Sequence, residues 1–271
     1  KSVIRLFVVC ILATLAGTAW GWDKDYALDD IVVTAPRPAG QPLNTTTLST
    51  GDLTARRYAT SDTASLLSDV PGVGLQGAGG VSSLPIIHGL ADDRVRIQMD
   101  GMDLMTACPN HMNPALSYID PTQVENIKVY AGITPVSVGG DSLGGTIQIE
   151  SAAPEFAGIG QGNLVKGQIG AFYRSNGNVL GANAEAILAS ENLNLTYTGS
   201  TVSADNYKAG GNFKPAGPAA PDQGWLGGDV VGSSAYEVTN QSLGIAYRMD
   251  NHLLTAKVDV QNSPYEGFPN Q

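Results

Sequence analysis

The sequence has 271 residues, of which 42% are hydrophobic and only 15% are charged, and its formal net charge is -10. High hydrophobicity with few charges argues against intrinsic disorder and against a coiled coil. The negative charge argues against nucleic acid as a partner, because binding to phosphates requires a cationic surface. The sequence contains no apolar run of about 18 residues, so we expect no membrane-spanning helix. The 33 Gly and 15 Pro indicate a chain rich in turns.

The first residues have the pattern of a targeting signal. Lys1 and Arg5 flank the start of a short apolar run, and small residues follow at 17–19. This order predicts a secretory signal peptide over residues 1–19. The alternative, a short buried helix, fits poorly with the acidic stretch that follows.

Export would leave the mature chain with one cysteine. Cys10 lies inside the predicted signal peptide, so only Cys108 remains. A single thiol cannot close an internal disulfide, and it suggests intermolecular pairing or a reactive thiol.

Residues 23–155 have the pattern of a small α+β domain. Asp62–Val70 is predicted to be a helix, capped by Ser61 or Asp62 and stopped by Pro71-Gly72, with Leu66, Leu67 and Val70 on its apolar face. Alternating apolar and polar residues predict three strands, and Asp100-Gly101 predicts a tight turn after the first of them. These strands are expected at Arg94–Met99, Gln123–Tyr130 and Gly144–Glu150.

The pattern changes after residue 160 to long alternating strands. Strands of about 10 residues with one apolar face are typical of a transmembrane β-barrel. A soluble β-sandwich is the alternative, but its strands are typically shorter. Aromatic residues near the strand ends favour the barrel: Phe172, Tyr173, Tyr197, Tyr236 and Tyr247. The predicted strands contain Asn163–Arg174, Val179–Ala189, Leu193–Thr198, Ser242–Arg248 and Leu254–Gln261.

These strands are too few for a complete barrel. About five fit between residues 163 and 262, whereas a closed barrel needs at least about eight. Because open strand edges are unstable in lipid, we expect the sequence to be part of a longer protein.

Several segments resemble the N-terminal part of TonB-dependent outer-membrane receptors. Asp30-Ile31-Val32-Val33-Thr34-Ala35 resembles the TonB box, and Leu67–Val73 resembles the start of the plug domain. Glu125–Gly132, followed by Gly139–Ile147, is similar to the end of the plug. His88 is a departure, since the family commonly carries Arg there, and no role is carried over to it.

The resemblance implies a box and linker at residues 20–40, an α+β plug domain at 41–155, and the first strands of an antiparallel transmembrane β-barrel at 156–271. The barrel has 22 strands in this family. It also implies active transport in the cell outer membrane, with outer-membrane lipid and the TonB energy-transducing complex as partners. An extended Ile31–Thr34 segment can pair edge-on with a partner strand, which Pro36 would then end. An ordinary edge strand is the alternative for this segment.

Soft metal ligands are concentrated between Met99 and Met112. Four of the five Met residues, Cys108 and His111 lie there. The spacing of Cys108 and Met112 places them on one face of a helical turn with Pro109 at its start, where the helix N-terminus would favour the thiolate. Thiolate and thioether together select Cu(I). His111 either adds an imidazole or points away, and the alternative for the cluster is a buried Cys with Met as filler.

The segment Cys108–Met112 resembles the Cys-x-x-x-Met element in the plug of TonB-dependent copper receptors. That resemblance implies a copper ion as the transported ligand and a His-x-Met pair from the barrel that completes the site. Here His252 is followed by Leu253 and Leu254, so the expected pair would lie beyond Gln271. His88 and His252 are interpreted as ordinary surface or core histidines.

Two other functions remain open from the sequence. A receptor for an organic metal chelate, such as a siderophore or a corrinoid, would have the same plug and box without a metal–protein bond. An enzyme with Cys108 as nucleophile and His111 as base is disfavoured, because no third group that would orient the base is apparent. We therefore expect no enzymatic activity and no catalytic cofactor.

Overall fold

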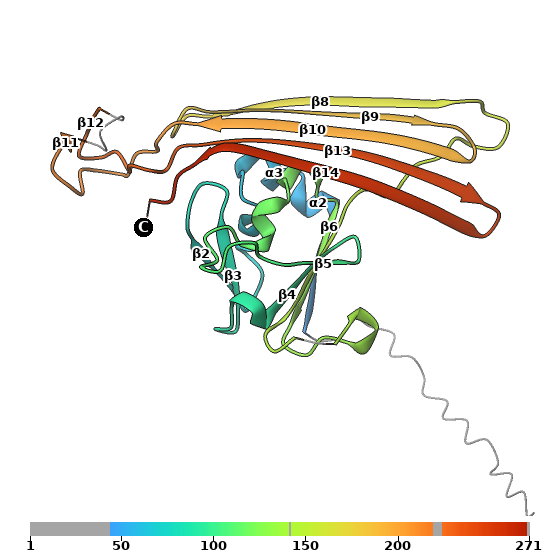
Figure 1. The fold of residues 1–271 in the computed structure, drawn as a ribbon, viewed down its shortest axis with the longest axis horizontal. Helices are drawn as coiled ribbons and strands as arrows, with labels where there is room; N and C mark the ends of the chain where they lie inside the picture. The colour runs from blue at the N-terminus through green and yellow to red at the C-terminus, as the bar shows by residue number, and fades with distance from the viewer. Residues whose placement is uncertain (1–43, 141, 219–223, 270–271) are drawn as a thin grey trace, which may run out of the picture. The chain divides into compact units, whose positions relative to one another are not determined.

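The computed structural model describes residues 44–140, 142–218 and 224–269, which all belong to one compact unit. The predicted signal peptide and the Asp30–Ala35 segment lie outside the described residues. Short strands and helices form the first part of this unit, and five long strands form the second (Figure 1).

The first part is organised around a five-stranded sheet with the order β1-β6-β7-β4-β5. The pair β4 and β7 is parallel and the other neighbours are antiparallel, so this is a mixed sheet. A separate hairpin, β2-β3, lies outside the sheet. The strands are β1 (Thr45–Leu48), β2 (Val73–Gly77), β3 (Ser83–Ile87), β4 (Val95–Met99), β5 (Met102–Leu104), β6 (Asn126–Ala131) and β7 (Gly145–Glu150). The helices are α2 (Thr50–Leu53), α3 (Arg56–Ala59) and the 3-10 helices η2 (Thr63–Leu67), η3 (Asp92–Arg94), η4 (Ala115–Tyr118), η5 (Pro121–Gln123) and η6 (Val136–Val138).

The three strands expected from alternation are present as β4, β6 and β7. The expected turn after β4 is also present, since Asp100 and Gly101 have φ angles of 51° and 83° and Met99 pairs with Met102. Two consecutive positive φ angles are typical of the type I′ turns that close short hairpins.

The helix expected at Asp62–Val70 is shorter and tighter than its sequence pattern suggests. Only η2 is helical there, with 3-10 geometry, and the Asp62 carboxylate caps it by accepting the Ala64 N–H at 3.2 Å. Val70 lies beyond the helix but is still buried. The helix ends at Leu67, and Pro71 disfavours a helical conformation for Val70, so the helix does not resume there.

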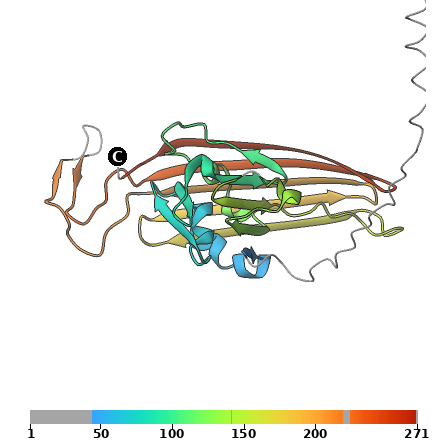
Figure 2. The ribbon, with the colours of Figure 1, turned by 90° about the horizontal axis from the view of Figure 1, so that it is seen from below.

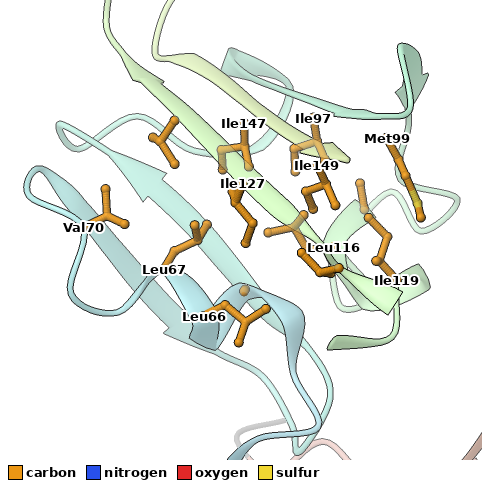
Figure 3. Close-up of a cluster of buried hydrophobic side chains, with 14 of the residues drawn as sticks. Leu66, Leu67, Val70, Ile97, Met99, Leu116, Ile119, Ile127, Ile147 and Ile149 are labelled. Carbon is orange, nitrogen blue, oxygen red and sulfur yellow. The ribbon is translucent and has the colours of Figure 1, made fainter. Parts of the chain in front are cut away.

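The core of this part is aliphatic. Side chains from η2, η4 and the central strands are directed toward one another (Figure 3). Leu66, Ile147 and Leu116 are fully buried. Burial of each such side chain contributes about 1.5–3 kcal/mol relative to leaving it in water.

Gly145, at the start of β7, requires the absence of a side chain. Its φ is 131°, and a Cβ there would lie 2.1 Å from the Tyr130 carbonyl oxygen. We expect Gly145→Ala to lower the free energy of unfolding by about 3 kcal/mol, because it combines a strained φ with a clash against backbone. Gly89→Ala is the matched control: Gly89 has φ 81° but open space at the Cβ position, so a cost of about 1–2 kcal/mol is expected. Calorimetric unfolding of the protein checks this, and equal effects of the two substitutions would contradict it.

The second part is a five-stranded antiparallel sheet with the order β14-β13-β10-β9-β8. Two views turned by 90° show its strands running alongside one another (Figures 1 and 2). All five strands expected from the sequence are present, and Val179–Ala189 has the expected bounds. The strands are β8 (Leu164–Arg174), β9 (Val179–Ala189), β10 (Leu193–Ala204), β13 (Tyr236–Met249) and β14 (His252–Glu266), and a small hairpin of β11 (Gly217–Pro218) and β12 (Trp225–Leu226) lies between β10 and β13.

The two faces of this sheet differ in the way the alternation predicts. Apolar side chains on one face are exposed, for example Ile169 at 87% and Val165 at 71%. Buried polar side chains on the other face include Asn194, Ser200 and Asn240. An exposed apolar face on strands of 11 to 15 residues matches the lipid-facing surface of a barrel. Among the described residues the sheet is open and does not close into a barrel.

Phe172 and Tyr236 lie near strand ends, as expected, whereas Tyr197 lies inside β10, which continues to Ala204. Tyr236 is buried and packs against Val81, and Phe172 packs against the same cluster. Both face inward, and the Tyr236 hydroxyl donates to Ser61 Oγ and accepts from the Arg174 guanidinium, each at 3.0 Å. Tyr173 and Tyr247 are exposed on the apolar face, as expected. None of the helices in the described part of the chain is long and apolar enough to cross a membrane.

Candidate functional site

Cys108, His111 and Met112 lie in a loop between β5 and η4, whereas Met99 lies on β4 and Met102 on β5. Within it the Cys108 carbonyl oxygen accepts the His111 N–H at 3.0 Å, which closes a single turn. No helix forms, so the expected helical turn from Cys108 to Met112 is wrong. His111 has φ 52°, in the left-handed region, which takes the chain out of the helical path after one turn.

Cys108 is a half-buried free thiol. The backbone N–H of Met112, followed by that of Asn110, lowers the pKa of the Cys108 thiol, with smaller contributions from Asn113 and His111 and a weaker opposing effect of burial. The expected stabilisation of the thiolate is thus present, but loop amides cause it instead of a helix N-terminus. Successive backbone N–H groups in a turn form such anion-binding concavities.

The methionines of the cluster do not share one environment. Met99 is 8% exposed and belongs to the hydrophobic core, as the filler interpretation predicts. Met102 and Met105 are exposed, Met105 to 86%. Met112 is half-buried in the same loop as Cys108, so these two remain the candidate ligand pair.

His111 lies beside a different feature. Its ring lines an open cavity of about 330 Å³ to which neither Cys108 nor Met112 contributes. The His111 Nδ1 atom is buried without a hydrogen-bond partner, 3.9 Å from Asp92 Oδ1. Of the two possibilities that the sequence leaves open, this geometry favours the one in which His111 points away from the ligand pair.

The cavity beside His111 has a mixed lining. Arg96 and Asp103 form a bidentate ion pair in it, with distances of 2.6 and 2.7 Å. The Arg96 guanidinium, followed by the Gln98 amide, holds the pKa of Asp103 below its usual value. Among the described residues, no group of three or more His, Cys, Asp and Glu side chains could hold a metal ion. The predicted pair of Cys108 and Met112 would need further ligands to form a closed site.

The other candidate residues lie apart from this loop. His88 is exposed in the turn after β3, and His252 is exposed at the start of β14. The box residues Asp30 to Ala35 lie outside the described residues.

One buried contact joins the two parts of the chain and was not expected from the sequence. The Asp120 Oδ2 atom accepts hydrogen bonds from Ser200 Oγ at 2.6 Å and from Asn240 Nδ2 at 3.0 Å. Asp120 is 8% exposed, and its Oδ1 atom caps η5 by accepting the Thr122 N–H at 2.7 Å. The sequence signals only the cap, because Asp before Pro121 is a typical helix start.

Comparison with known families identifies the first part. Residues 38–146 match the family model described as "TonB-dependent Receptor Plug Domain". The chain carries a TonB-dependent receptor plug domain. This confirms the predicted resemblance, and the strands that follow the plug match those of TonB-dependent receptor barrels in fold.

Solved structures share the fold of the plug and the strands. "Copper transporter OprC" is 22% identical with a TM-score of 0.63, and the match covers 82% of this chain and 31% of that one. The FrpB iron transporter from Neisseria meningitidis is 18% identical with a TM-score of 0.65, covering 81% and 32%. The hemophore receptor HasR of Serratia marcescens is 15% identical with a TM-score of 0.62, covering 82% and 32%. The chain thus spans about a third of the length of these proteins. Comparison with curated proteins gave no match.

Proposed function

We propose that the protein takes up copper across the outer membrane by TonB-dependent active transport, with Cys108 and Met112 as Cu(I) ligands in the plug. The observation that carries the proposal is the Cys108 loop, in which a turn closed by the His111 N–H holds a half-buried free thiol four residues from a half-buried Met. The lowered pKa of the Cys108 thiol, caused by the neighbouring backbone N–H groups, agrees with a ligand role. Thiolate and thioether are soft ligands that suit Cu(I). One of the proteins with the same fold is named as a copper transporter.

In this proposal residues 1–19 are a signal peptide, 20–40 hold the TonB box and linker, 41–155 are the plug, and 156–271 begin the barrel. The exposed apolar face of β8 to β14 supports contact with outer-membrane lipid. Because the outer membrane has no energy source of its own, the box would pair with the inner-membrane TonB complex by backbone hydrogen bonds.

The second candidate is a receptor for an organic metal chelate with no metal–protein bond. It is favoured by the names of other proteins that share the fold, which include iron transporters and a ferric enterobactin receptor. In that case the Cys108 loop would have no ligand role.

Copper uptake by energised cells that express the complete receptor separates the two candidates. We expect the Cys108→Ser/Met112→Ala double variant to lose most of its copper uptake at equal surface expression. Uptake of ferric enterobactin and of haem, measured in parallel, should stay at background in both strains. If the double variant took up copper at the wild-type rate, Cys108 and Met112 would not be the ligands. If both strains took up ferric enterobactin or haem above background, the chelate receptor would be favoured.

A further inference from the structure

A single tyrosine hydroxyl joins the two ends of the Cys108 loop. The Tyr118 hydroxyl accepts the Ala107 N–H at 3.0 Å and donates to the Asn113 carbonyl oxygen at 3.1 Å. Cys108 directly follows Ala107, and Met112 directly precedes Asn113. Each candidate ligand is therefore next to a residue that the same oxygen atom holds, so this clamp fixes the distance between the two ligand backbones.

The loop inside the clamp has a conformation that needs support. His111 has φ 52°, which is unfavourable for a residue with a side chain. Such residues persist only where surrounding contacts determine the conformation. The one internal backbone hydrogen bond, from His111 N–H to the Cys108 carbonyl oxygen, does not reach the ends of the loop.

The tyrosine is itself held in place. Tyr118 ends η4, in which Ala115 and Leu116 are buried in the plug core. The Gln261 side chain of β14 donates to the Ser117 carbonyl oxygen at 3.0 Å. Contacts with the plug core and with β14 therefore hold Tyr118 in position.

A second contact ties the same end of the loop to β14. When the Asn113 amide is turned so that its nitrogen faces Glu266, the orientation that satisfies both amide atoms, this nitrogen donates to the two Glu266 carboxylate oxygens at 3.1 and 3.0 Å and to Ser82 Oγ at 3.1 Å. The Ser82 hydroxyl also donates to Glu266. Ser82 is fully buried and Asn113 and Glu266 are half-buried, so the cluster is partly shielded from water, which strengthens its hydrogen bonds.

We propose that Tyr118 and Glu266 are positioning residues, which pre-organise the Cys108–Met112 pair for Cu(I) through a contact between the plug and β14. This inference rests on the proposed function. Pre-organisation increases affinity because the ordering of the loop no longer opposes binding. Neither residue binds the metal. Each acts by fixing one end of the loop that carries the ligands.

Tyr118→Phe tests the clamp, because it removes only the hydroxyl. In anaerobic competition titrations of the complete receptor against a Cu(I) chelator, we expect affinity to fall about tenfold, since two hydrogen bonds are lost. Tyr173→Phe is the matched control: it also removes one hydroxyl hydrogen bond, to Asn178 at 3.2 Å, but on β8. In a Met112→Ala background the effect of Tyr118→Phe should shrink, because the clamp then aligns only one ligand.

Two readouts separate positioning from general damage. Amide hydrogen exchange without copper should accelerate at Ala107 and across the loop in Tyr118→Phe, while the sheet amides and the melting temperature stay unchanged. For the β14 anchor, Glu266→Ala should weaken Cu(I) binding, and Glu266→Gln should restore most of it because its side-chain oxygen still accepts from Asn113.

The outcomes distinguish this inference from the proposed function. Equal Cu(I) affinities for wild type and Cys108→Ser would overturn the metal site, and loop exchange would still decide whether Tyr118 holds the loop. Wild-type affinity and wild-type loop exchange in Tyr118→Phe would overturn the positioning role while leaving the copper site intact.

Discussion

Deletion of Asp30–Ala35 is expected to abolish energised copper uptake and to leave copper binding at the cell surface unchanged. The reason is that this segment would contact only the periplasmic energy-coupling partner, whereas the proposed ligands Cys108 and Met112 lie in the plug. The measurement is accumulation of radioactive copper by energised cells, compared with copper retained by de-energised cells at equal receptor levels.

Two substitutions of Val33 provide a matched pair that tests the same segment without deleting it. Val33→Pro should act like the deletion, because proline lacks the N–H that a strand pairing needs, and Val33→Thr should transport normally. If the deletion strain accumulated copper at the wild-type rate, active transport through this segment would have to be abandoned.

Cys108→Ser is expected to weaken Cu(I) binding more than Met112→Ala. The thiolate carries a charge and the thioether does not, so we expect a loss of more than about a hundredfold for Cys108→Ser and about tenfold for Met112→Ala, given that even partners of metal ligands are worth 10- to 100-fold. Met105→Ala is the control, since Met105 is a strongly exposed Met of the same segment. Anaerobic competition titration of the complete receptor measures all three.

The same titration has an expected pH dependence. Protons compete with the metal for the thiolate, so affinity should fall on acidification. Because the loop amides lower the pKa of Cys108, the thiolate persists to lower pH, and the fall should begin below the ordinary thiol pKa of about 8.5. If wild type and the Cys108→Ser/Met112→Ala variant bound Cu(I) equally, the chelate receptor would become the leading candidate.

The strands of both parts could be read from the sequence because alternation is a local signal. Each of β8 to β10, β13 and β14 places apolar residues at every second position, and the pleat of a strand turns that period directly into two different faces. The same reasoning located β4, β6 and β7. Sequence reasoning was correct only in part for Asp62–Val70, where the apolar spacing is helical but only a short 3-10 helix forms, which ends at Leu67.

The residue types predicted where the candidate ligand loop lies but not which conformation it has. A spacing of four between Cys108 and Met112 fits both a helix and a turn, and Pro109 suits the first turn of either. The loop forms a turn and not a helix, because His111 has a left-handed backbone conformation and Tyr118 holds the loop ends. No local pattern indicates that His111 lies beside Asp92, which is far from it along the chain.

Composition, alternation and motif order by themselves determined a plug followed by long strands with one apolar face, and the position of a Cys–Met pair. Tertiary structure alone decided that Asp120 accepts hydrogen bonds from residues 80 and 120 positions away. It likewise decided that Glu266 reaches Asn113 beside the loop. Periodicity follows from the geometry of one strand, whereas a contact between distant residues depends on how whole elements pack, and that information is spread over the entire chain.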